Sequence, residues 1–189
     1  MAAVKESIYT VTDLPFTSCG LQTFLEGSMD DEIRHRIRSV IKKEAPITEW
    51  LLIKRVINSF DIWKAGSNVR TLMISILSDM GLRTTIENDT VVFWRRTQDP
   101  KTYNEYRLFG KDDLSCRDVT NVPVPEITNA MAAVLKKNGS MEYEELSRAT
   151  AELLGYSRMG SNVKEAMRQA AEYGTAIRKF RRRGTKYTS

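Results

Sequence analysis

Cysteine and histidine are scarce in this chain, and their scarcity removes several kinds of active site. The two cysteines, Cys19 and Cys116, are far apart and match no metal-ligand spacing, which is typical of a reduced, cytoplasmic protein. The one histidine, His35, is flanked by Arg34 and Arg36 on a predicted helix. Because charged neighbours favour a solvated helix face, we do not expect His35 to serve as the base of a nucleophilic site.

Long apolar runs and phosphate-binding loops are also missing. No stretch approaches the roughly 18 consecutive apolar residues of a membrane-spanning helix, and residues 1–10 lack the apolar run of a signal peptide. The pattern G-x-x-x-x-G-K-[ST] of nucleotide-binding loops occurs nowhere in the chain. We therefore expect no membrane partner and no motor domain.

Acidic clusters, the remaining source of metal ligands, have simpler interpretations. Asp30-Asp31-Glu32 and Glu144-Glu145 fall at predicted helix starts, where negative charge interacts favourably with the helix dipole. Asp112-Asp113 falls in a predicted loop. The sequence thus predicts no metal, no cofactor and no catalytic residue, and we expect that the protein is not an enzyme.

Positive charge is concentrated near the C-terminus. The formal net charge is +5, but residues 164–189 hold eight basic and two acidic side chains, so the remainder carries −1. Residues 178–186 contain six cations, no acid and one aromatic residue, a composition that suits a nucleic-acid backbone. The alternative is a solvated chain end.

A gapless internal repeat organises the sequence. Gly66-Ser67-Asn68-Val69 recurs as Gly160-Ser161-Asn162-Val163, an offset of 94 positions. At this offset, residues 32–77 share 11 identities in 46 positions with residues 126–171. The repeat predicts a duplicated structural unit.

Each copy has the periodicity of three helices followed by a hairpin. In the first copy, apolar residues recur at helical spacing over residues 33–41, 52–60 and 69–77. Strand-forming residues then flank Asn88-Asp89, a candidate two-residue turn, and Pro46-Ile47 is expected to supply a short extra strand. This order predicts a mainly helical α+β protein with small hairpins, made of two tandem winged-helix domains.

The repeat also sets the predicted domain boundaries. Residues 1–29 form an N-terminal extension, residues 30–97 the first winged-helix domain, and residues 125–189 the second, which carries the basic tail and a truncated hairpin. Residues 98–124 are proline-punctuated and contain aromatic side chains, so we expect this linker to pack on one or both domains.

Short motifs spread over residues 30–175 carry a family resemblance. They include Glu44-Ala45-Pro46-Ile47, Gly66-Ser67-Asn68-Val69-Arg70, Val92-Phe93-Trp94, Tyr106-Arg107, Pro125-Glu126-Ile127 and Leu153-Leu154-Gly155-Tyr156-Ser157-Arg158-Met159-Gly160. These motifs resemble an uncharacterised bacterial domain found at the C-terminal end of large superfamily-one helicase-like proteins. The resemblance implies an accessory role in DNA or RNA transactions and no activity of the domain's own. The chain departs from the long family members because it lacks the helicase motor.

Candidate nucleic-acid contacts lie where helix-turn-helix proteins contact DNA. The recognition helix of such proteins enters the major groove with its N-terminal residues, and hairpin and tail cations add phosphate contacts. The candidates are Lys64, Ser67, Asn68, Arg70, Thr71, Arg95, Arg96, Arg158, Ser161, Asn162, Lys164, Arg168, Arg178, Lys179, Arg181, Arg182, Arg183 and Lys186. The alternative for the two Ser-Asn pairs is that they cap their helices, a role compatible with phosphate binding.

The expected function is therefore a non-catalytic nucleic-acid-binding accessory module. We expect weak sequence specificity, duplex DNA as the ligand, and association with a helicase or nuclease. The recognition helices are sparsely basic, and Asp79, Glu165 and Glu172 would repel phosphate. These acids favour the alternative function, a protein–protein docking scaffold built on the same winged-helix domains.

Overall fold

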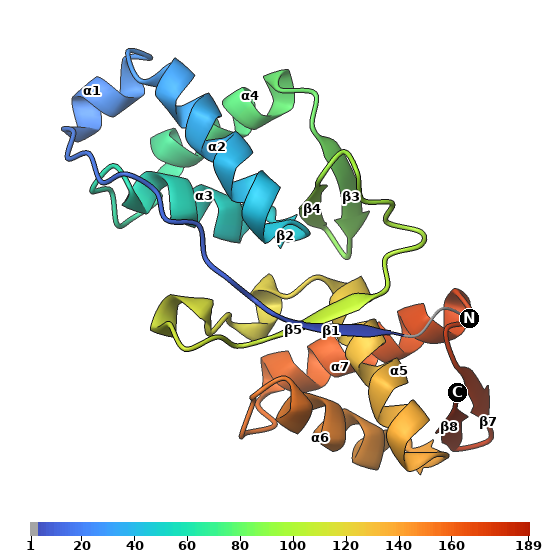
Figure 1. Ribbon diagram of the computed structural model, residues 1–189. Helices are drawn as coiled ribbons and strands as arrows, with labels where there is room; N and C mark the ends of the chain where they lie inside the picture. Colours follow the sequence, from blue (N-terminus) through green and yellow to red (C-terminus); the bar gives the residue numbers. More distant parts are fainter. Residues whose placement is uncertain (1–3) are drawn as a thin grey trace. The chain divides into compact units, whose positions relative to one another are not determined.

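The computed structural model describes residues 4–189, which form seven α-helices, two short 3-10 helices and eight strands (Figure 1). The chain divides into two compact units. The first unit is Val11–Asp99, and the second unit combines Pro100–Ser189 with the beginning of the chain up to Thr10. The fold is mixed α and β with small sheets, in agreement with the predicted α+β class.

Helices form most of the first unit. Its elements are α1 (Leu21–Leu25), α2 (Asp30–Glu44), β2 (Ile47–Thr48), α3 (Glu49–Asn58), α4 (Ser67–Asp79), β3 (Arg83–Glu87) and β4 (Thr90–Trp94). The three strands pair antiparallel in the order β2-β4-β3. The predicted turn is confirmed: Asn88 and Asp89 join β3 to β4, and both have positive φ, as the tight hairpin turn requires.

The core of the first unit follows the helical periodicity of the sequence. Ile33, Ile37 and Val40 of α2 are fully buried, because their spacing puts them on one face of the helix. The predicted stripe of α4 is likewise turned inward, with Val69 and Met73 buried. Burial of these apolar faces is the main term that stabilises the unit.

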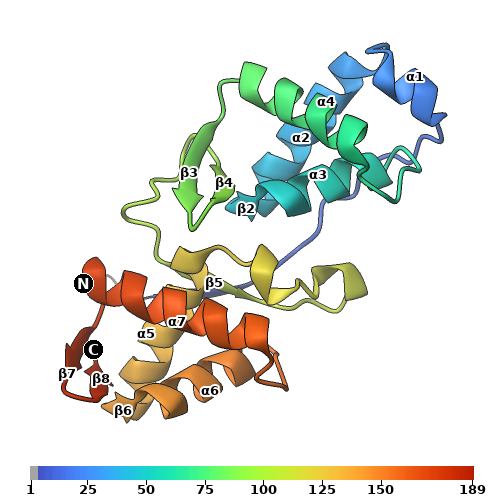
Figure 2. The same ribbon diagram turned by 180° about the vertical axis from the view of Figure 1, so that it is seen from behind.

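The second unit contains one additional pair of strands. Its elements are β1 (Lys5–Ile8), β5 (Glu105–Leu108), η1 (Asp113–Ser115), η2 (Val119–Asn121), α5 (Val124–Asn138), β6 (Met141–Glu142), α6 (Tyr143–Leu153), α7 (Ser161–Ala176), β7 (Arg181–Arg183) and β8 (Lys186–Thr188). Strands β1 and β5 pair in parallel, and β5 packs on α5. Strands β6, β8 and β7 form a separate antiparallel sheet in that order (Figure 2).

Segments outside the predicted domains contribute to both units. Of the predicted extension, residues 4–10 belong to the second unit, while residues 11–29, including α1, belong to the first. The predicted linker, 98–124, supplies β5 and both 3-10 helices to the second unit. Tyr106 of this segment is buried in the core of that unit, which gives the aromatic content of the linker a structural role.

The same order of elements recurs in the two units at the offset of the sequence repeat. The pairs α2 and α5, β2 and β6, α3 and α6, and α4 and α7 each begin 94 positions apart. The sheet orders β2-β4-β3 and β6-β8-β7 correspond. Phe93 and Tyr187, also 94 positions apart, are buried aromatic residues paired with the first residue of the short strand. The hairpin of the second unit is shorter, with three residues in each strand where the first unit has five.

The second unit contains a buried cluster of one acid and two arginines. Glu126, in the first turn of α5, has no exposed surface and binds two guanidinium groups: Arg107 of β5 at 2.6 Å and Arg117 at 2.5 Å. Burial alone would raise the pKa of Glu126, but the two arginines outweigh it and lower the pKa to about 2. The ring of Tyr9, which follows β1, lies 4.0 Å from the Arg117 guanidinium carbon. The cluster therefore links β1, β5 and α5.

Small residues let the second unit pack its helices closely. Ala130 of α5 and Ala170 and Ala171 of α7 are buried in the core. Gly174 of α7 lies under the ring of Phe180, so that an added Cβ would come within 2.2 Å of that ring. Phe180 thereby fixes the start of the β7–β8 hairpin to α7.

Candidate nucleic-acid interface

The first turns of α4 and α7 present the same short polar surface. Ser67, Asn68 and Arg70 of α4 are exposed, as are Ser161 and Asn162 of α7. The N-cap residues are Gly66 and Gly160, so the interpretation of the Ser-Asn pairs as side-chain caps is wrong. The amides of the first helical turn lack helical partners and point out of the helix, where they can donate to an anion.

The exposed face of α7 carries no net charge, because Lys164 and Arg168 are balanced by Glu165 and Glu172. The guanidinium group of Arg168 binds Glu165 and Glu172 on the same helix, each at 2.6 Å. The hydrogen bonds from Arg168 and Gln169 lower the pKa of Glu165 to about 2, so that the pair stays ionised. Arg168 is thus occupied by two carboxylates, and Lys164 is the remaining cation on the exposed face of this helix.

The β7–β8 hairpin sorts its cations onto two faces. Arg182 is paired with Tyr187, and its guanidinium carbon lies 5.9 Å from the centre of that buried ring, so the two side chains share the inner face although Arg182 is itself exposed. Arg182 also donates to the carbonyl of Gly184 at 3.0 Å. Arg181 and Arg183, one position to either side, therefore project from the outer face.

Lys186 lies on the same outer face, but it has an acidic residue beside it. It is paired with Arg183 across the hairpin and with Glu142 of β6 on its other side. Glu142 also accepts a hydrogen bond from Thr185 at 3.0 Å. Lys179 lies just before the hairpin, donates to Asn104, and has its pKa lowered by burial. Arg181 and Arg183 are consequently the most available cations of the hairpin, and Arg178, which precedes it, is also exposed.

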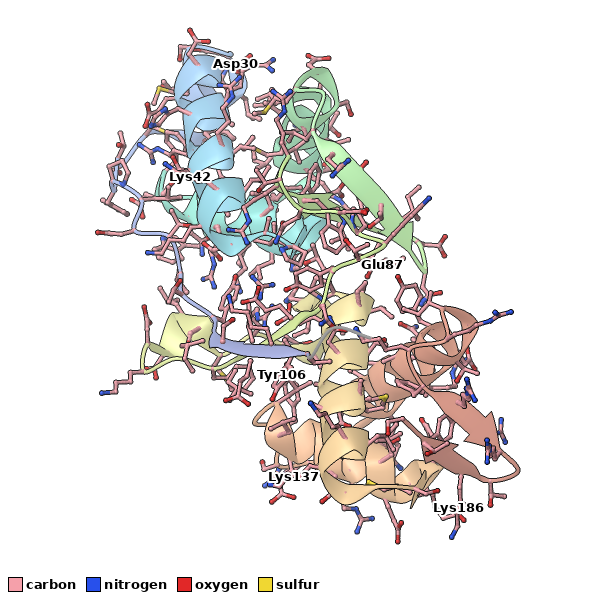
Figure 3. The ribbon with its side chains drawn as sticks, turned by 45° about the vertical axis from the view of Figure 1, so that its right-hand side comes forward. Asp30, Lys42, Glu87, Tyr106, Lys137 and Lys186 are labelled. Carbon is pink, nitrogen blue, oxygen red and sulfur yellow. The ribbon has the colours of Figure 1, made fainter. Side chains whose placement is uncertain are left out.

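The two hairpins have opposite charges at their turns. Glu87 and Asp89 lie at the turn of β3–β4, whereas Arg183 and Lys186 flank the turn of β7–β8. Figure 3 marks Glu87 and Lys186 on the two hairpins. Of the two hairpin turns, the β7–β8 turn has the positive charge that attracts a polyanion.

A basic groove opens at the base of the first hairpin. It has a volume of about 1150 Å³ and is lined by Arg38, Ile41, Lys42, Met80, Gly81, Leu82, Arg83, Thr84, Trp94, Arg95, Arg96 and Thr97. Five of these lining residues are cations and none is an acid. Arg95 and Arg96 were predicted to bind nucleic acid, whereas Arg38, Lys42 and Arg83 were not.

Sequence patterns could have indicated the three groove cations that were not predicted. Arg38 and Lys42 are four positions apart on α2, which places them on one exposed face. The Asn88-Asp89 turn sets a hairpin register that pairs Arg83 with Trp94, next to Arg95. Counting residues outward from the turn would therefore have predicted that Arg83 of β3 lies close to the two arginines that follow β4.

The predicted residues do not gather at one place within each unit. The groove contains Met80–Leu82, which follow α4, so Arg95 and Arg96 lie near the C-terminal end of that helix. Ser67 is at the other end of a 13-residue helix, about 20 Å away. The β7–β8 hairpin likewise follows the C-terminal end of α7 (Figure 2). The remaining predicted residues, Lys64, Thr71, Arg158 and Arg178, are exposed.

Comparison with known proteins gives one partial match. Residues 22–71 match a family model described as "Protein of unknown function (DUF3320)". The match covers α1 to the start of α4, and it agrees with the resemblance to an uncharacterised domain. No curated protein and no solved structure matches the chain.

Metal-binding clusters and membrane-spanning helices are both absent from residues 4–189. Within this part of the chain, no three histidine, cysteine, aspartate or glutamate side chains are grouped so that they could hold a metal ion. None of the helices described here combines the length and the apolar composition needed to cross a membrane.

Proposed function

We propose that this protein is a non-catalytic accessory module that binds duplex DNA through two winged-helix domains and serves a helicase or nuclease. The order of helix, short strand, two helices and hairpin in each unit supports the winged-helix interpretation. The resemblance to a domain of helicase-like proteins supports the accessory role. Contacts to phosphate, rather than to bases, would dominate such binding.

The outer face of the β7–β8 hairpin carries the proposal. Arg181 and Arg183 are exposed there, and neither takes part in an ion pair among the described residues. Their charges contribute nothing visible to the packing of the second unit, while Phe180 and Tyr187 on the inner side hold the hairpin in place. A rigid support with free cations on its solvent face is what a phosphate backbone requires.

Three single substitutions that remove the same charge test this proposal. Affinity for a labelled 20-base-pair duplex is measured by fluorescence anisotropy at several salt concentrations. We expect Arg181→Ala and Arg183→Ala each to reduce the slope of log affinity against log salt by about 1. Arg182→Ala, on the inner face, should leave the slope nearly unchanged. Equal losses from all three variants, or no binding of the duplex by the native protein at low salt, would contradict the proposal.

Exposed apolar side chains favour a second candidate function, protein docking. In the first unit, Trp63 is 67% and Ile86 76% exposed, and Ile74 projects from α4. The neutral face of α7 also suits a protein partner better than a phosphate backbone. If neither duplex nor single strands bind at low salt, docking becomes the favoured function.

A further inference from the structure

The groove at the base of the first hairpin concentrates charge that the fold does not use. Arg38, Lys42, Arg83, Arg95 and Arg96 line it, and none of the five forms an ion pair within residues 4–189. Two acids close to these cations in sequence are paired with other residues: Asp79 binds Arg34 at 3.5 Å, and Glu44 binds Arg55 at 3.2 Å. Like charges in one groove repel one another and destabilise the folded state, so packing does not explain their placement.

The wall of the groove is held in a fixed shape. The side-chain amide of Gln98 donates to the carbonyl of Ala45 at 3.0 Å, and its oxygen accepts from the backbone amide of Arg95 at 2.9 Å. The guanidinium group of Arg83 donates to the backbone carbonyl of Gln98. These bonds connect β3, the end of β4 and the end of α2, so the cations lie on a preorganised surface.

The groove also has apolar walls. Ile41, Leu82 and Trp94 line it beside the cations, although the Trp94 ring is almost fully buried. Its volume, about 1150 Å³, exceeds the usual 300–1,000 Å³ of small-molecule sites, and it is open to solvent. A single strand of nucleic acid presents phosphates together with uncovered bases and sugars, whereas a duplex hides its bases.

We propose that this groove binds the backbone of single-stranded nucleic acid. The four arginines can each grip a phosphate through two N–H donors, and Lys42 adds a fifth charge. The site rests on the proposed nucleic-acid function but extends it, because it lies in the first unit and takes a different form of the ligand. The second unit lacks a counterpart of Arg38, because buried Ala132 stands 94 positions after it.

The test compares two double variants of the full chain with equal charge changes. The groove variant is Arg38→Ala with Arg96→Ala, and the control is Lys43→Ala with Lys136→Ala, two exposed lysines outside the groove. Affinity for a labelled 15-nucleotide oligothymidylate is measured across salt concentrations. We expect the groove variant to bind about ten-fold more weakly and to lose about 1.4 from its salt slope. The control should lose far less.

Competition and duplex binding separate this inference from the proposed function. Inorganic polyphosphate should displace the oligonucleotide much better than polyglutamate of equal charge; equal displacement would overturn the phosphate site in favour of an acidic protein partner. Arg181→Ala should weaken duplex binding and leave oligothymidylate binding intact. If the groove variant binds the oligonucleotide as tightly as the native protein does, while Arg181→Ala still weakens duplex binding, only the groove proposal is refuted. If Arg181→Ala leaves duplex binding unchanged, while the groove variant binds the oligonucleotide more weakly, only the proposed hairpin interface is refuted.

Discussion

The two units share an order of elements and differ in where they place charge. In the first unit the hairpin turn is acidic, with Glu87 and Asp89, and the cations lie in the groove at its base. In the second unit the hairpin itself is basic, and two arginines are buried around Glu126. The apolar faces that set the framework are common to both, whereas the charges on and beside the hairpins differ. Similar frameworks can therefore carry different binding surfaces.

The glutamates at positions 32 and 126 give the largest expected contrast. Glu126→Gln leaves two buried guanidinium groups without their counter-charge, so we expect a loss of about 3–5 kcal/mol in the free energy of unfolding. Glu32→Gln should cost less than about 1 kcal/mol, because Glu32 is 41% exposed and Arg36 keeps its bonds to Ser59 and Thr17. Urea denaturation of both variants measures the difference. Equal losses would show that burial of the cluster has little energetic importance.

Acid should reproduce part of that contrast. The folded-state pKa of Glu126, about 2, lies below the ordinary value of 4.5, so the ionised form stabilises the folded second unit. This stability is complete above about pH 4.5 and is lost as the pH falls toward 2, by up to about 3 kcal/mol. Denaturation as a function of pH should show a larger loss in the native protein than in Glu126→Gln, in which Glu165, whose pKa is also lowered, still responds to acid. A similar acid response in both would assign it to other carboxylates.

Gly174→Ala tests the close packing that only the second unit has. The new methyl group would overlap the Phe180 ring, and we expect a destabilisation of about 1–3 kcal/mol together with a displaced β7–β8 hairpin. Gly160→Ala is the control, since an added Cβ there meets no atom within 4 Å. Thermal unfolding gives the stabilities, and duplex affinity reports on the hairpin. A Gly174→Ala variant as stable as the control would mean that the packing relaxes without cost.

The smallest effect concerns Lys42 and Lys136, which occupy equivalent places in the last turns of α2 and α5. Both interact with a helix dipole, but only Lys42 lies among other cations. We expect Lys136→Gln to destabilise slightly and Lys42→Gln to be neutral or stabilising, a difference of about 0.5 kcal/mol. Paired thermal melts at low salt measure it, and the difference should shrink when salt is added. A difference of the opposite sign would argue against repulsion within the groove.

Local patterns predicted the elements better than the contacts between them. Helical spacing located α2 and α4, and the preference of Asn88-Asp89 for positive φ located the hairpin. The β1–β5 pair was not predictable, because it joins Lys5 to Glu105 across 100 residues and β1 is only four residues long. The Ser-Asn pairs were wrongly interpreted as helix caps. Residue types that favour the N-cap position also occur in the first helical turn, and here the glycine before each pair is the N-cap.

The candidate site was predicted in part for the same reason. A run of cations identified Arg181 and Arg183 directly, but the strand alternation that distinguishes them from Arg182 requires the register with Tyr187. The groove combines α2 with both strands of the hairpin, and residues as distant as Arg38 and Arg96 meet there. The partners of Glu126 lie outside the repeat, so the repeat gave no indication of them.

The pairing of β1 with β5 makes the first unit an insertion within the second. Along the sequence, β1 of the second unit comes first and is followed by the whole first unit, Val11–Asp99. The second unit resumes at Pro100. During synthesis the inserted unit can fold early, while the surrounding one must wait for its last helix and hairpin. Cleavage between Thr10 and Val11 would release β1 together with Tyr9 and uncover Arg117, so a nick far from the C-terminal half in sequence would weaken that half first.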